Sequence, residues 1–115
     1  MFETYKIINL EKEADANLKF LFDDIRKRNF KDWEQRLEKM RLDYIALKEK
    51  FKHDKKQLLK LAIDWKDYTN NFYDLNTHVE IKIEAMGDEV YDKLIEETEV
   101  VLREIEKRFS KLVNE

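Results

Sequence analysis

The sequence has 26 aspartates and glutamates but very few of the histidine, cysteine and serine residues that most catalytic and metal sites use. The chain has two histidines, His53 and His78, and no cysteine. Neither histidine has another histidine four residues away, and neither stands in the Glu-x-x-His spacing that di-iron helical bundles use. The one serine, Ser110, has no histidine near it in the sequence. We therefore expect no catalytic site, and we expect both histidines to be ordinary surface or turn residues.

A pair of carboxylates could offer a different chemistry. Glu11 lies among the apolar residues of an amphipathic segment, and Asp15 follows it one helical turn later. A carboxylate inside a core is costly unless it is paired. We expect Glu11 to reach solvent near the end of a helix bundle. The alternatives are that it binds a metal or forms a specific ion pair.

Glu84 and Asp88 have the same spacing of four residues. The stretch Glu84-Ala85-Met86-Gly87-Asp88 resembles the acidic metal-binding motif of PhoU-type phosphate-regulation proteins, and residues 10–15 resemble a Glu-x-x-x-Asp motif of their relatives. The resemblance implies three-helix bundles that hold iron or zinc on carboxylates. The arginine that usually follows the first acid is Ala85 here, and the rest of the pattern is missing. We assign no family from it and expect no metal or other cofactor.

The composition favours an all-helical protein and excludes several other classes. The 115 residues include no proline and one glycine, so a Gly-rich loop that cradles phosphate is absent. Charged residues make up 43% of the chain. No apolar run approaches the length of a membrane span, and the N-terminal residues contain acids where a secretory signal would be basic and then apolar. We expect one cytoplasmic domain over residues 1–115 and no enzyme activity.

Apolar residues recur at alternating spacings of three and four, the pattern of helices packed side by side. Nine positions seven residues apart are all apolar: Phe30, Leu37, Tyr44, Phe51, Leu58, Trp65, Phe72, Val79 and Met86. A second series starts three residues later, and six of its seven positions are apolar, with Asp54 as the exception. We call these two series the apolar seam. They predict an all-α bundle with coiled-coil-like heptad contacts.

We predict three long antiparallel helices, at about residues 3–28, 31–70 and 77–114. Asn29 marks the first turn, and the second lies in residues 70–77, where three asparagines make a poor helix former. The alternative is an up-down bundle of four helices with a break near residues 53–55. Asp54 and Gln57 have the spacing of a helix cap there. We prefer three helices because the apolar seam keeps its phase through this region.

The first helix is shorter than the middle one, so part of the apolar seam is expected to stay uncovered. Uncovered apolar patches usually mark interfaces. We predict a protein interface that consists of Leu58, Leu61, Trp65, Tyr68 and Phe72. The expected partner is a second copy of the chain or a helical protein, and no small-molecule substrate is implied. The predicted function is that of a non-enzymatic interaction or scaffold protein.

Two alternative functions stay open. One is a small cytoplasmic chaperone or adaptor of the secretion type, which would hold another protein's amphipathic helix. The other is a nucleic-acid binder, because residues 26–60 contain thirteen basic and six acidic groups. Residues 61–115 contain seven basic and fourteen acidic groups, which would repel DNA. We therefore favour neutralisation between packed segments over nucleic-acid binding.

Overall fold

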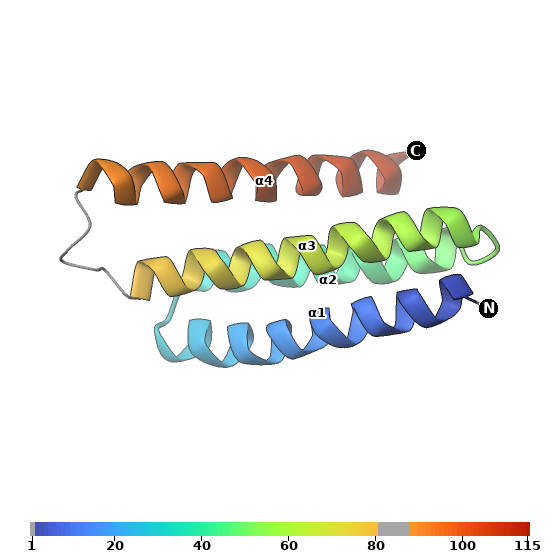
Figure 1. Ribbon diagram of the computed structural model, residues 1–115, viewed down its shortest axis with the longest axis horizontal. Coiled ribbons are helices and arrows are strands. Elements are labelled where there is room, and N and C mark those ends of the chain that lie inside the picture. Colours follow the sequence, from blue (N-terminus) through green and yellow to red (C-terminus); the bar gives the residue numbers. More distant parts are fainter. Residues whose placement is uncertain (1, 81–87) are drawn as a thin grey trace.

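The computed structural model describes residues 2–80 and 88–115 (Figure 1). Within these residues the chain forms four α-helices and no strand: α1 (Phe2–Lys27), α2 (Lys31–Lys50), α3 (Lys55–Glu80) and α4 (Asp88–Asn114). Successive helices run in opposite directions along a body of 49 × 26 × 25 Å. The prediction of an all-helical fold is confirmed.

The chain reverses between α2 and α3, where one continuous helix was predicted over residues 31–70. The Phe51 N–H bonds to the Leu47 carbonyl at 2.9 Å and closes α2. The Gln57 N–H then donates to Asp54 Oδ1 at 3.1 Å, a side-chain cap at the start of α3. The apolar seam keeps its phase here because residues on both sides of the turn face the same core. The four-helix alternative fits this arrangement.

The asparagine-rich residues 70–77 lie inside α3, so the turn predicted there is wrong. Asn70 and Asn76 bond to α1, whereas Asn71 bonds to the Asp67 carbonyl within α3. Asn17 Nδ2 of α1 donates to Thr69 Oγ1 at 3.2 Å and also to Asn70. Asn76 is buried, and its Nδ2 donates to Asp24 Oδ2 at 2.7 Å. These tertiary bonds outweigh the weak helix propensity of asparagine. The predicted turn at Asn29 is confirmed by its positive φ of 61°.

One core runs through the bundle and includes residues of all four helices. α3 packs against each of the other three helices, whereas the backbones of α1 and α4 do not approach each other closely in the described part of the chain. Figure 1 shows α1 and α4 on opposite sides of the α2–α3 pair. α1 and α3 run in the same direction, and residues 52 apart lie side by side, as Asn17 and Thr69 do.

Candidate protein-binding groove

The predicted interface is mostly inside the protein's own core. Leu61, Trp65, Tyr68 and Phe72 are buried, with Trp65 only 2% exposed, and Leu58 is half-buried. The premise of an uncovered apolar seam is therefore wrong for these residues. The physical reason is the turn at 51–54, which folds α2 back so that it covers α3 together with α1 and α4. The Tyr44 ring of α2, for example, stacks on the Trp65 ring at 5.2 Å between centroids.

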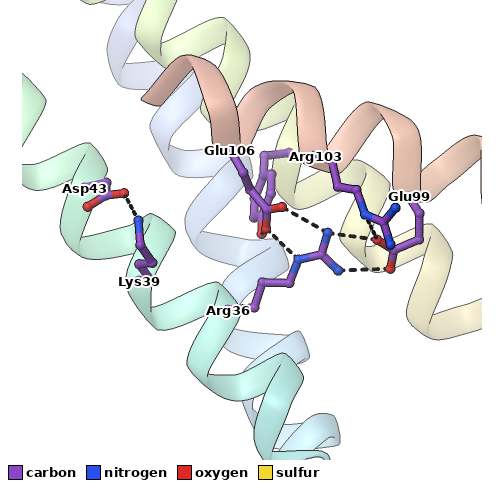
Figure 2. Close-up of polar contacts among 7 residues, drawn as sticks. Arg36, Lys39, Asp43, Glu99, Arg103 and Glu106 are labelled. Atoms are coloured by element: carbon purple, nitrogen blue, oxygen red, sulfur yellow. Dashed lines mark hydrogen bonds and ion pairs between the residues drawn. The ribbon is translucent and has the colours of Figure 1, made fainter. Parts of the chain in front are cut away.

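A cluster of charged side chains joins α2, α3 and α4 (Figure 2). The Arg36 guanidinium donates to Glu99 at 2.8 and 2.9 Å and to Glu106 at 2.5 and 3.0 Å. Arg103 lies 3.6 Å from the same Glu99 carboxylate. The Tyr68 hydroxyl of α3 donates to Glu106 at 2.7 Å. Two cations and two carboxylates balance one another, so the cluster needs no ligand and acts to hold the helices together.

Burial and charge shift the pKa values in this cluster. Burial disfavours the charged form of Arg36, but its hydrogen bonds to Glu106 and Glu99 outweigh that effect and raise the pKa of Arg36. Burial raises the pKa of the Tyr68 hydroxyl, and the neighbouring Glu106 raises it further. Arg36 therefore stays ionised and Tyr68 stays protonated across the physiological range. Lys39 and Asp43, also drawn in Figure 2, form a separate 2.8 Å ion pair along α2.

A groove of about 810 Å³ lies between α1 and α2. Its apolar part consists of Leu18, which is buried, Phe22, which is half-buried, and Leu42, which is 52% exposed. Its polar lining residues are Arg26, Glu34, Gln35, Glu38, Lys39 and Arg41. We call this feature the α1–α2 groove. An apolar strip between charged rims is the form of surface that accepts an amphipathic helix.

The charges around the α1–α2 groove are paired with one another. Arg26 bonds to Glu34, and Arg41 Nη2 lies 2.6 Å from Glu38 Oε1. Arg26 also lies over the Phe22 ring, with its guanidinium carbon 5.0 Å from the ring centroid. The third cation of the lining, Lys39, pairs with Asp43 outside the groove. The distinguishing property of the groove is therefore its apolar strip.

A smaller hollow of about 130 Å³ adjoins the groove, and the two share Leu18 and Arg41 as lining residues. We call it the Tyr44 hollow. Its other lining residues are Glu11, Asp15, Tyr44, Ile45, Lys48 and Trp65. Lys48 Nζ lies 2.7 Å from Glu11 Oε2, and Glu11 is half-buried. Of the three readings of Glu11, the specific ion pair matches this geometry.

The remaining candidates for metal chemistry are not brought together. In residues 2–80 and 88–115, no group of three or more histidine, aspartate or glutamate side chains could hold a metal ion. His53 is exposed in the turn after α2, and His78 is half-buried near the end of α3. Glu84 lies outside the described residues, so its proposed pairing with Asp88 stays a prediction.

Several of the basic residues considered for nucleic-acid binding are occupied within the chain. Lys48 pairs with Glu11, and Lys52 Nζ lies 3.0 Å from Glu49. Lys50 donates to the Leu112 carbonyl of α4 at 2.5 Å. Of the aromatic residues in 26–60, Tyr44 is buried and Trp33 and Phe51 pack against the core, whereas Phe30 is exposed.

Sequence reasoning missed Leu42 and Ile45, the most exposed apolar residues of α2. Both are about half exposed and lie outside the apolar seam. Their spacing of three residues places them on adjacent turns of one helix face. This spacing is the sequence signal that could have revealed a second apolar surface on α2. The apolar seam already supplies the residues that one core requires, so two further apolar residues beside it indicate an additional surface.

Comparisons with known proteins leave the site without a precedent. Protein-family models, curated proteins and solved structures yield no match to this chain. Within the described residues, every helix is too short or too polar to cross a membrane.

Proposed function

We propose that this protein is a non-enzymatic interaction protein that holds an amphipathic helix of a partner protein in the α1–α2 groove. The observation that carries the proposal is the half-exposed pair Leu42 and Ile45: Leu42 lines the groove together with Phe22, and Ile45 lines the adjoining Tyr44 hollow. Apolar side chains at this spacing complement the apolar stripe of an incoming helix, whose anchors recur every three or four residues.

The polar chemistry of the bundle is consistent with this role. Arg36 has two carboxylate partners, Arg41 has Glu38, and Lys48 has Glu11. Charged groups already paired in this way have their hydrogen bonds taken up within the chain. The apolar surface of the groove is thus the more suitable element for function. A cytoplasmic chaperone or adaptor would be one biological form of the same activity.

A peptide titration followed by NMR tests the proposal. The probe is a synthetic amphipathic helix of about 18 residues, or five turns, with leucine on one face. The amide resonances of Phe22, Leu42 and Ile45 should shift on titration. The Leu42→Glu variant should lose these shifts, because a carboxylate would be buried without a partner. Val100→Glu is the matched control, since Val100 is 49% exposed on α4, whose backbone does not approach that of α1 closely in the described residues.

Light scattering on the same samples tests self-association through the groove. A dimer of the wild-type chain that Leu42→Glu converts to a monomer would make a second copy the occupant. The proposal would be refuted if the protein is a monomer and the amide resonances of Phe22, Leu42 and Ile45 do not shift at millimolar peptide.

A further inference from the structure

The Tyr44 hollow contains a buried polar group without a full hydrogen-bond partner. Tyr44 is 4% exposed, and its hydroxyl oxygen has no partner in full hydrogen-bond geometry among the residues that the structure describes; Glu11 offers it only a weak interaction. Such a group is costly in a folded protein unless a water or a ligand satisfies it. Burial raises the pKa of this hydroxyl, and the charges of Glu11 and Asp15 and a weak hydrogen-bonding interaction with Glu11 raise it further. The hydroxyl therefore lies in the field of both carboxylates.

Asp15 supplies one unbalanced charge in the same hollow. Arg41 is paired with Glu38 and Lys48 with Glu11, whereas Asp15 has no ion pair within residues 2–80 and 88–115. Burial and the charge of Glu11 raise the pKa of Asp15, and Lys48 offsets them only in part. Asp15 is exposed, so a cation from outside can reach its carboxylate.

The spacing along α1 connects this hollow to the groove. Asp15 lines the hollow, and Phe22, seven residues later, lines the groove. Seven residues of helix span about 10.5 Å at 1.5 Å per residue. A second helix lying along α1 has the same rise, so its residues seven apart can reach both places. The hollow has room for about four waters at 30 Å³ each, which is enough for a cationic head group.

We propose that the helix bound in the α1–α2 groove carries a lysine or arginine seven residues from its apolar anchor, and that this cation enters the Tyr44 hollow. The carboxylate of Asp15 is its counter-ion, and the hydroxyl oxygen of Tyr44 accepts one of its hydrogen bonds. This inference rests on the proposed function, and it names the chemistry of the partner: an amphipathic helix with one basic residue beside its apolar stripe.

The test compares two synthetic peptides of about 18 residues that share a leucine face. One has arginine seven positions to each side of its central leucine, so that either orientation presents a cation, and the other has glutamine at both positions. Calorimetry should show at least about tenfold tighter binding of the arginine peptide to the wild-type protein, equivalent to about 1.4 kcal/mol. The Asp15→Asn variant should reduce that preference to under about twofold without weakening binding of the glutamine peptide.

Two further variants test whether the arginine binds in the Tyr44 hollow or is attracted to acidic residues of the protein in general. Asp23→Asn removes another exposed acid of α1, one that pairs with Lys27, and should leave the arginine preference unchanged. Tyr44→Phe keeps the ring that stacks on Trp65 and should reduce the preference a few-fold. Equal affinities for the two peptides, or a preference that survives Asp15→Asn, would refute the proposed basic anchor. Such a result would leave the proposal of helix binding in the α1–α2 groove unaffected. Binding of neither peptide would overturn both proposals.

Discussion

Arg36 of α2 and Tyr68 of α3 donate hydrogen bonds to the same oxygen, Oε2 of Glu106 on α4. Three helices from distant parts of the sequence thus meet at one carboxylate. The cluster is half-buried, and its hydrogen bonds satisfy groups that would be costly to leave alone. It fixes how α4 is seated on the rest of the bundle.

The Glu106→Gln variant should lower the free energy of unfolding by about 2 kcal/mol, because Arg36 keeps one carboxylate partner and Tyr68 loses its charged acceptor. Urea denaturation followed by circular dichroism measures the change. Glu104→Gln, at an exposed site on α4, is the control and should stay within about 0.5 kcal/mol of the wild type. Equal stabilities for both variants would mean that the cluster holds nothing in place.

The Asp54→Ala variant should lower stability by about 1 kcal/mol, because the Gln57 N–H loses its side-chain acceptor at the start of α3. Asp54→Ser, which retains a capping oxygen, should recover most of the loss. Thermal unfolding of the three proteins measures both effects. An alanine variant as stable as the wild type would argue against a helix start at this position and in favour of a continuous α2–α3 helix.

Trp65→Ala should destabilise the protein by about 3–5 kcal/mol, because it removes a buried side chain that stacks on Tyr44 and Tyr68. The loss should not depend on protein concentration, since the contacts lie within one chain. Denaturant midpoints recorded over a hundredfold range of concentration provide the check. A loss of stability that appears only at high protein concentration would indicate that Trp65 lies at an interface between chains.

The raised pKa of Asp15 implies a specific pH dependence. The folded protein holds the Asp15 proton more tightly than the unfolded chain does, so ionisation of Asp15 weakens the fold. Its contribution is therefore present below the ordinary pKa of 3.8 and is lost as the pH rises through the higher folded value. Asp15→Asn should raise the melting temperature at pH 7 and leave it nearly unchanged at pH 3. A variant less stable than the wild type at pH 7 would show that the Asp15 charge is compensated in the free protein.

Periodicity predicted the helical class and most of the core, because burial alone imposes a spacing of three and four. It could not locate the α2–α3 turn, since residues before and after a tight turn can face the same core without a change of phase. The asparagines of α3 misled for a different reason. Asn70 and Asn76 gain their partners from α1, more than fifty residues away, and no local pattern reports such bonds.

The groove was the least predictable feature. Leu42 and Ile45 are visible in the sequence as apolar residues outside the seam, but their exposure depends on how closely α1 approaches α2. The Tyr44 hollow depends on an ion pair between residues 37 positions apart and on the unpaired hydroxyl of a seam residue. Sequence indicated Glu11 as unusual, and only the packing of α1 against α2 showed its partner.

The register of 52 residues between α1 and α3 has a consequence for biosynthesis. α1 leaves the ribosome before α2 and α3, so the helix that bonds to Asn17 and Asp24 is made only after α2 is complete. At about 5–20 residues per second, the nascent chain carries its first helix without that neighbour for several seconds. Until α3 is made, Leu18, Leu21 and Ile25 lack the cover that α3 gives them in the folded bundle, so we expect a holdase chaperone to have most to bind in this interval.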